Sequence, residues 1–219
     1  MKKILFLMLL GCHLVFLGTP AFSDDAADVD TLIKTSMNDV LAIAKHPDTP
    51  DEQKRKELWQ VVLRTFDFEK ITEFTLGQFS YNATSNLGEY ADRRFSKEQQ
   101  AEFRELFTKH LGNNYLDRLD FKNVDVDIQL KPAEILEPKK GIKRAQAGTM
   151  INSKTPIDYM LLNEGKAWKV YDIKVEGRSL VSAFRNEYKT ILLKDKPVVL
   201  IRMLKDKIAE HEAAKKIKP

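Results

Sequence analysis

The sequence predicts an α+β domain in which an antiparallel sheet of about four strands packs against surrounding helices. Three observations lead to this prediction. Apolar residues recur at helical spacing in the first and last parts of the chain, apolar and polar residues alternate in between, and a short turn joins two of the alternating segments. Strands that cluster between two helical groups favour α+β over an alternating α/β chain.

The first 23 residues have the pattern of a secretory signal peptide. Two lysines precede an apolar run over residues 4–17, and the small residues Ala21 and Ser23 indicate cleavage after Ser23. The apolar run is short for a membrane span. One alternative stays open, because residues 9–12 resemble a lipobox in which Cys12 would carry a lipid anchor.

Charge and cysteine content narrow the possible functions. Removing residues 1–23, which hold two lysines and no acidic residue, changes the net charge from +4 to +2, with 34 basic against 32 acidic residues. This balance gives no basic excess for a nucleic-acid partner. The single cysteine lies in the leader, so the exported chain must be stabilised by its core without disulfides.

Two helices are expected at the start of the exported chain. Residues 28–44 carry one apolar stripe, which predicts an amphipathic helix. Thr49 and Pro50 predict the start of the next helix, with Thr49 as the N-cap and Pro50 in the first helical position.

Two further helices follow. Asp67 is expected to cap a short helix that ends at Gly77, and Ser96 with Gln99 forms a capping box that opens the longest helix. The apolar side of that longest helix consists of residues at helical spacing: Phe103, Leu106, Phe107, Leu111, Tyr115 and Leu119.

Period-two alternation predicts the strands, which we place at residues 123–130, 145–152, 157–162 and 167–175. The first of them is expected to point Ile128 and Leu130 inward, and residues 163–166 are expected to form a hairpin turn.

Helices over residues 179–193 and 198–208 are expected to close the domain. The charged residues 210–219 predict a flexible tail. The chain is thus divided into a leader, one domain over residues 24–209, and the tail.

Signatures of catalysis are absent from the sequence. His46, His110 and His211 lie far apart, without the spacing of a metal site, and there is no nucleophile elbow or glycine-rich phosphate loop. One enzymatic alternative stays open, because Asp172 and Glu176 are four residues apart on an expected strand and would face the same side. The simpler interpretation is that Asp172 pairs with a cation or the backbone and that Glu176 begins a turn.

One long run carries a family resemblance. Its pattern is a W-K-V-Y-D strand, then E-G-x-S-L, then a helix with an aromatic-Arg pair and a further aromatic residue. The matching positions are Trp168, Val170, Tyr171, Asp172, Glu176, Gly177, Ser179, Leu180, Phe184, Arg185 and Tyr188. This run resembles the MlaC, or toluene-tolerance, family of periplasmic phospholipid-binding proteins. Arg178 departs from it in a position expected to be apolar, and about ten residues within 78–95 resemble an insertion relative to the family.

The resemblance implies a periplasmic carrier with an apolar lipid pocket, which shuttles diacyl phospholipid and so maintains outer-membrane asymmetry. Its implied partners are an outer-membrane lipoprotein–porin complex and an inner-membrane transporter with an MCE-type docking subunit. The lipid is cargo, no cofactor or enzymatic activity is expected, and a lipid-free envelope scaffold is the other alternative.

The residues expected to line the pocket come from the longest helix, two strands and the helix after residue 179: Phe103, Phe107, Leu111, Tyr115, Tyr159, Leu161, Tyr171, Ile173, Val175, Leu180 and Phe184. The strand residues among them are expected to share one face of the sheet. Arg178 is a candidate docking residue, whereas Arg185 is expected to hold a helix to the sheet.

Overall fold

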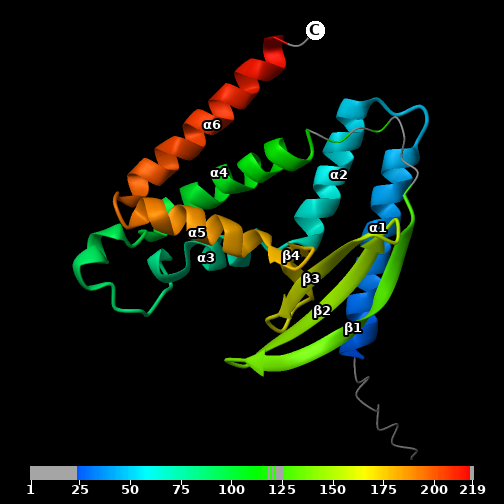
Figure 1. The fold of residues 1–219 in the computed structure, drawn as a ribbon, viewed down its shortest axis with the longest axis horizontal. Coiled ribbons are helices and arrows are strands. Elements are labelled where there is room, and N and C mark those ends of the chain that lie inside the picture. Colours follow the sequence, from blue (N-terminus) through cyan, green and yellow to red (C-terminus); the bar gives the residue numbers. More distant parts are fainter. Residues whose placement is uncertain (1–23, 118, 120, 122–125, 218–219) are drawn as a thin grey trace, which may run out of the picture.

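A computed structural model describes residues 24–117, 119, 121 and 126–217 (Figure 1). The expected signal peptide with its cleavage after Ser23, and the alternative anchor at Cys12, concern residues outside the described part of the chain, as do residues 123–125 of the first expected strand.

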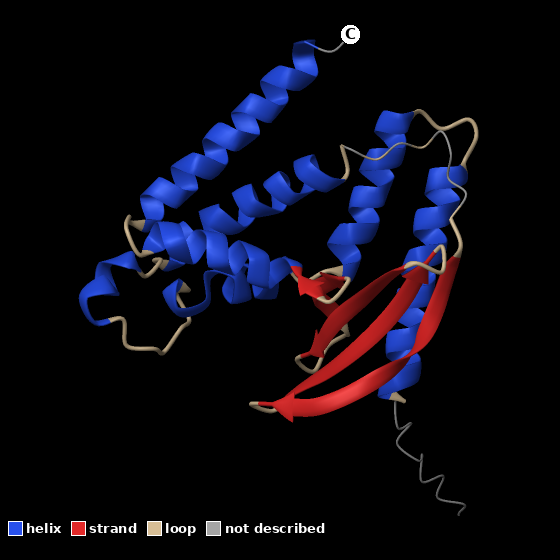
Figure 2. Ribbon diagram, in the orientation of Figure 1, coloured by secondary structure: helices blue, strands red, loops and turns tan. Residues whose placement is uncertain are grey.

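Five antiparallel strands form one sheet in the order β1-β2-β3-β4-β5 (Figure 2). Their bounds are β1 Ile128–Lys139, β2 Ile142–Ile151, β3 Thr155–Asn163, β4 Lys169–Val175 and β5 Arg178–Ser179. The α+β fold is confirmed, and the two-residue β5 adds a strand to the four that alternation predicted.

The first strand differs from its prediction. It extends to Lys139, because register shifts on either side of Glu134 carry it past Pro132. Proline is tolerated there because β1 lies at the edge of the sheet, where its outer side needs no ladder hydrogen bond. The inward placement of Leu130 was wrong, since this side chain is 43% exposed.

Six α-helices and two short 3-10 helices surround the sheet within the described residues. They are α1 Asp25–Lys45, α2 Asp51–Thr65, α3 Phe68–Leu76, η1 Gly77–Phe79, η2 Gly88–Arg93, α4 Lys97–Tyr115, α5 Leu180–Leu192 and α6 Pro197–Ile217. Where a flexible tail was expected from residue 210, α6 continues to Ile217. His211 of this extension bonds Asp117 after α4, with 2.7 Å between Nε2 and Oδ2.

Most expected helix ends are confirmed. Asp67 accepts a hydrogen bond from the backbone N–H of Lys70, and Ser96 with Gln99 forms the capping box. The N-cap at Thr49 was wrong: its hydroxyl instead bonds Nδ1 of His46 at 2.9 Å, and α2 begins after Pro50 without a side-chain cap. The residues around His46 and Pro50 therefore stabilise the α1–α2 turn rather than the first turn of α2.

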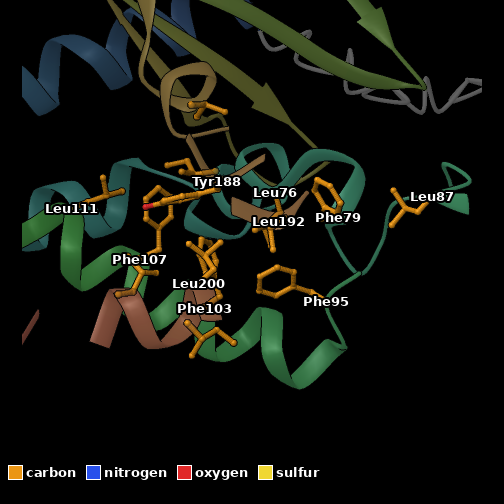
Figure 3. Packing of buried hydrophobic residues seen from close by; sticks show 14 residues of the cluster. Leu76, Phe79, Leu87, Phe95, Phe103, Phe107, Leu111, Tyr188, Leu192 and Leu200 are labelled. Carbon is orange, nitrogen blue, oxygen red and sulfur yellow. The ribbon is translucent and has the colours of Figure 1, made fainter. Parts of the chain in front are cut away.

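Buried apolar residues form two cores. One lies among α3, α4, α5 and α6 and includes Phe103, Phe107 and Tyr188 (Figure 3). The other lies between α1 and the sheet, where Val29 and Ile33 pack with sheet residues (Figure 1). The helices after α2 and the pair of α1 with the sheet thus form two lobes, and the space between them holds the candidate site.

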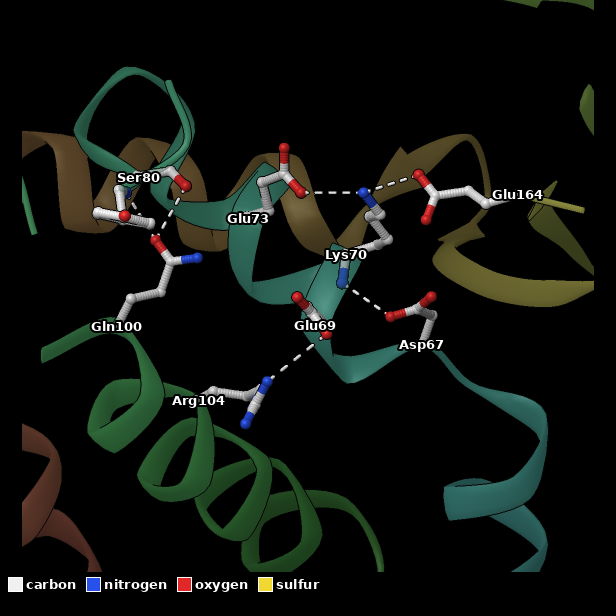
Figure 4. Close-up of polar contacts among 9 residues, drawn as sticks. Asp67, Glu69, Lys70, Glu73, Ser80, Gln100, Arg104 and Glu164 are labelled. Atoms are coloured by element: carbon white, nitrogen blue, oxygen red, sulfur yellow. Dashed lines mark hydrogen bonds and ion pairs between the residues drawn. The ribbon is translucent and has the colours of Figure 1, made fainter. Parts of the chain in front are cut away.

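Polar contacts link α3 to its neighbours (Figure 4). The Lys70 ammonium lies 3.2 Å from Glu73 and 2.8 Å from Glu164, which belongs to the β3–β4 turn. Burial acts to lower the pKa of Lys70, but the hydrogen bonds that its ammonium donates to the two carboxylates outweigh burial and raise it. Glu69 meets Arg104 of α4 at 3.7 Å, so α3 is linked to both the sheet and the helical lobe.

The segment with the expected insertion is compact. The Arg94 guanidinium bonds the backbone carbonyls of Ser80, Ala83 and Ser85, and the N–H of Phe95 bonds the Phe79 carbonyl at 2.9 Å. One cation therefore satisfies three carbonyls of a loop that contributes little regular structure.

Candidate functional site

A cavity of about 620 Å³ lies where α2, α3, α4 and α5 meet strands β3 and β4. Its wall is mainly apolar and aromatic, formed by Trp59, Val62, Phe66, Phe68, Ile71, Leu111, Tyr115, Leu116, Ile157, Tyr159, Tyr171, Ile173, Val175, Leu180, Val181 and Ala183. The polar members are Asp172, Glu176, Arg178 and Ser179. Its size and lining are those of a site for an apolar ligand.

One side of the cavity is exposed to solvent. Tyr115 at the end of α4 is 52% exposed and Val175 at the end of β4 is 45% exposed. Glu176 and Arg178 lie beside Val175 and are also exposed. This rim, which we call the mouth, therefore combines apolar side chains with two charges of opposite sign.

The inner end of the cavity is buried. Tyr159 is 6% exposed, and its hydroxyl donates a hydrogen bond to Sδ of Met37 in α1 at 3.8 Å. Burial raises the pKa of the Tyr159 phenol, so this residue stays neutral at physiological pH. The inner end thus offers an uncharged surface.

A bulge in β4 determines which side chains reach the cavity. Met160 is opposite Asp172 but Leu161 is opposite Val170, so Tyr171 has no partner in β3. Tyr171 leaves the strict alternation and packs edge-to-face on Phe74 of α3, with 5.1 Å between ring centroids. A bulge redirects a side chain in this way because the extra residue belongs to neither face.

The structure brings together seven of the eleven residues expected to line a pocket: Leu111, Tyr115, Tyr159, Tyr171, Ile173, Val175 and Leu180. Four of the five strand residues share one face of the sheet as expected, namely Tyr159, Leu161, Ile173 and Val175. Leu161 lies in the α1 core on that face and does not line the cavity, and Tyr171 departs from the face because it lies in the bulge.

Phe103, Phe107 and Phe184 lie in the aromatic core instead of the cavity wall. The Phe107 ring lies 5.4 Å from Phe103 and 5.0 Å from Phe184. Only the end of α4, from Leu111 onward, lines the cavity. The earlier part of the helix packs against α3 and α6, and its Phe107 ring contacts α5. The apolar stripe of α4 therefore faces the aromatic core at Phe103 and Phe107 and the cavity at Leu111 and Tyr115.

The cavity also uses residues that we had not selected, chiefly Trp59 and Val62 of α2 with Phe66 and Phe68 after it. In the sequence, Leu58, Trp59, Val62 and Leu63 recur at helical spacing, and Phe66 and Phe68 flank Asp67. Neither feature shows that this face turns toward a cavity instead of toward a filled core.

Asp172 and Glu176 occupy separate environments. Asp172 is buried and accepts hydrogen bonds from the Ser179 hydroxyl at 2.5 Å and from the N–H of Val181 at 3.0 Å. Glu176 is exposed in the turn before Gly177, with φ of +50°. The carboxylate of Asp172 thus joins β4 to α5, which supports the simpler interpretation of this pair.

Arg185 contacts α3 instead of the sheet, to which it was expected to hold its helix. Its Nε donates to the carbonyl of Phe74 near the end of α3, at 2.5 Å. The side chain also lies beside Gly77, where an added Cβ would come within 3.5 Å of Arg185 Cδ. Arg185 therefore holds α5 to α3, not to the sheet.

The described residues contain neither a candidate metal cluster nor a candidate membrane-spanning helix. No group of three or more His, Cys, Asp or Glu side chains is placed to hold a metal ion in that part of the chain. Among the helices that the structure describes, none is long and apolar enough to cross a membrane.

The model of the MlaC protein family matches residues 34–206. The chain belongs to the MlaC family. The matched range runs from α1 into α6 and so includes every element that lines the cavity. No curated protein matches this MlaC-family chain.

A solved structure has a similar fold. It is the phospholipid-binding protein from Ralstonia solanacearum, determined in complex with a phospholipid. The two chains are 22% identical with a TM-score of 0.65, over 84% of this chain and 99% of the other. The similarity shows that this MlaC-family chain shares that fold over nearly the whole length of the neighbour.

Proposed function

We propose that this chain is a periplasmic phospholipid carrier that encloses the acyl chains of a diacyl lipid in the cavity. The observation that carries this proposal is the cavity of about 620 Å³ with a mainly apolar wall and one exposed side. Membership of the MlaC family supports it. The Ralstonia solanacearum protein, which has the same fold, was determined with a phospholipid bound.

The energetics explain why such a carrier needs an enclosed cavity. Two acyl chains hold roughly 30 methylenes, and exposing them to water would cost on the order of 20 kcal/mol at about 0.8 kcal/mol each. The apolar wall removes this cost during passage through water. The wall offers few fixed polar contacts. The lipid therefore need not be more stable in the cavity than in a bilayer, and it can be released to a membrane.

The mouth is the proposed position of the lipid headgroup. Glu176 and Arg178 are exposed there beside Val175. We expect the seven wall residues predicted from the sequence to contact acyl chains, with Trp59 and Phe68. Phe103, Phe107, Leu161 and Phe184 support the wall from the adjoining cores.

Transport between membranes requires partners at both ends. We propose an outer-membrane lipoprotein–porin complex and an inner-membrane transporter with an MCE-type subunit, in the maintenance of outer-membrane lipid asymmetry. The exposed Arg178 at the mouth is the proposed docking residue, because a partner must reach the mouth to receive lipid. Its charge would act on the rate of encounter more than on affinity.

We propose that the chain is exported and that its leader is cleaved after Ser23. N-terminal sequencing of the protein recovered from the periplasm should begin at Asp24. Recovery of a diacylated Cys12 with the membranes would instead establish the lipoprotein.

Mass spectrometry of organic extracts tests the carrier directly. The purified, folded protein should release diacyl phospholipid in an amount close to one molecule per chain, and the delipidated protein should take up labelled phospholipid from vesicles. A folded protein that yields no phospholipid and takes up none would overturn the proposal in favour of an envelope scaffold.

A further inference from the structure

A second recess lies on the opposite face of β4 from the cavity. Its volume is about 390 Å³, and it is enclosed by the β1–β2 hairpin, the end of β3, α3 and α5. In β2 and β3, Arg144 and Leu162 line this recess and are paired across the two strands. Tyr159 faces the cavity from the other side of the sheet, as its position in β3 requires.

The recess carries an excess of positive charge. Five basic side chains line it: Lys70, Lys139, Lys140, Arg144 and Arg185. The lining holds two carboxylates, Glu73 and Asp172. Both are already used, because Glu73 pairs with Lys70, and Asp172 accepts bonds from Ser179 and Val181.

Three of the basic side chains are available to a ligand. Within the part of the chain that the structure describes, Lys139, Lys140 and Arg144 make no ion pair or side-chain hydrogen bond. Arg144 is half-buried, and in the sheet it is paired with Leu136 on one side and Leu162 on the other. A cation in that position is stabilised when an anion supplies the missing hydrogen bonds.

We propose that this recess binds a phosphate-type anion and that its occupancy is coupled to the lipid cavity through Tyr171. Inorganic phosphate and the headgroup of a second phospholipid, separate from the lipid carried in the cavity, share the required chemistry. A tetrahedral oxyanion can accept hydrogen bonds from the Arg144 guanidinium and from two lysine ammonium groups at once. The recess is also small enough to favour a phosphate group over a folded protein surface.

Tyr171 provides the coupling because it lines both spaces. It is the unpaired residue of the β4 bulge, so its ring is not fixed by a strand partner on either side. Its contact with Phe74 continues this connection, since Phe74 also lines the recess. An anion in the recess and an acyl chain in the cavity would therefore both lie beside Tyr171, whose ring packs on Phe74. This coupling rests on the proposed lipid function, whereas the anion site itself does not.

Amide chemical shifts of the full mature protein can test the site. We expect millimolar inorganic phosphate, against chloride at equal ionic strength, to shift the amides of residues 139–144. Glycerol 3-phosphate serves as a headgroup without acyl chains, and tighter binding of it than of inorganic phosphate would identify the headgroup as the source of the anion. Shifts no larger than those in chloride, with either probe, would overturn the site.

Charge reversal locates the binding. The Lys139→Glu, Arg144→Glu double variant should weaken phosphate binding by about tenfold or more, as expected for the loss of at least one charge-assisted hydrogen bond. The Lys154→Glu, Lys194→Glu double variant changes the net charge equally at exposed positions outside the recess and should bind within twofold of wild type. Arg144→Gln is the milder variant if the first does not fold. Equal losses in the recess and control variants would show that only overall charge matters, which overturns the site.

The coupling is read from phosphate affinity in lipid-free and lipid-loaded protein, with lipid content checked by mass spectrometry. We expect the two affinities to differ by about fivefold or more, and Tyr171→Leu to reduce that difference to below twofold. Equal affinities in wild type would overturn the coupling. A protein that takes up no lipid would count against the proposed carrier and leave the phosphate result interpretable by itself.

Discussion

Asp172 of β4 accepts a hydrogen bond from the Ser179 hydroxyl across the turn at Gly177, with 2.5 Å between the two oxygens. Its second oxygen accepts the N–H of Val181 in the first turn of α5. Ser179 also caps that helix by accepting from the N–H of Ser182 at 2.9 Å. One buried carboxylate and one hydroxyl thus fix the direction in which α5 leaves the sheet beside the cavity.

Asp172→Ala should lower the free energy of unfolding by about 3 kcal/mol, because it removes two hydrogen bonds to a charged acceptor and leaves the Val181 N–H without one. Urea denaturation measures this loss. Ser179→Ala keeps the Val181 bond and should cost about 1–2 kcal/mol, through the lost cap and one hydroxyl bond. Equal stability of Asp172→Ala and wild type would contradict the structural role of this carboxylate.

Ile173→Glu should give a folded protein with at least about tenfold less bound phospholipid. The half-buried Ile173 faces the cavity, where an unpaired carboxylate beside acyl chains would carry an uncompensated desolvation cost. Mass spectrometry of extracted lipid, with circular dichroism for folding, measures both properties. Ile135→Glu in β1 is the matched control, since Ile135 is 44% exposed and lies outside the cavity.

Phe107→Glu should instead prevent folding. Phe107 is 1% exposed within the aromatic core, so the substitution combines a lost ring with a buried charge and should cost more than about 4 kcal/mol. Thermal denaturation followed by circular dichroism shows whether Phe107→Glu fails to fold while Ile173→Glu remains folded. A folded Phe107→Glu variant that lacks lipid would place this residue in the binding site after all.

The different outcomes expected for Ile173→Glu and Phe107→Glu show which features the sequence could predict and which it could not. Local signals determined the elements well, because the capping box at Ser96 and the cap at Asp67 depend on residues three positions apart. The division of the α4 stripe between Phe107 and Leu111 depends on where α5 crosses it, which is a tertiary property. Likewise, the alternation of β4 gave no sign of the bulge that displaces Tyr171, since an extra residue changes the pairing without changing composition.

Arg178→Glu should leave lipid content unchanged and slow transfer to an inner-membrane MCE-type complex, more so at low salt. Within the described residues the exposed Arg178 side chain has no hydrogen bond or ion pair, so its charge is available to steer an encounter. A fluorescent-lipid transfer assay over a range of ionic strength measures the rate. Arg202→Glu on the exposed side of α6 makes the same charge change away from the mouth and should transfer at the wild-type rate. Salt-independent, unchanged transfer by the Arg178 variant would remove its docking role.

His110 should make the protein less stable as the pH falls below about 6.5, its ordinary pKa in an unfolded chain. The Asn114 amide nitrogen lies 2.9 Å from His110 Nε2 and can only donate, so Nε2 must be unprotonated in the folded state. Burial, and then the nearby Lys207 cation, lower the pKa of His110. The unfolded chain therefore binds this proton more readily than the folded chain does, and the contribution to stability is present above about pH 6.5 and lost as the pH falls toward the lowered pKa.

Urea denaturation between pH 8 and pH 5 tests this linkage. His110→Gln should flatten the pH dependence, because a glutamine carbonyl can accept the Asn114 hydrogen bond but does not titrate. Asp117, whose pKa is held low because hydrogen bonds from Lys215 and His211 outweigh its burial, contributes only at more acidic pH and does not interfere. An unaltered slope in His110→Gln would show that another group carries the pH dependence, and would contradict the neutral imidazole that the Asn114 contact requires.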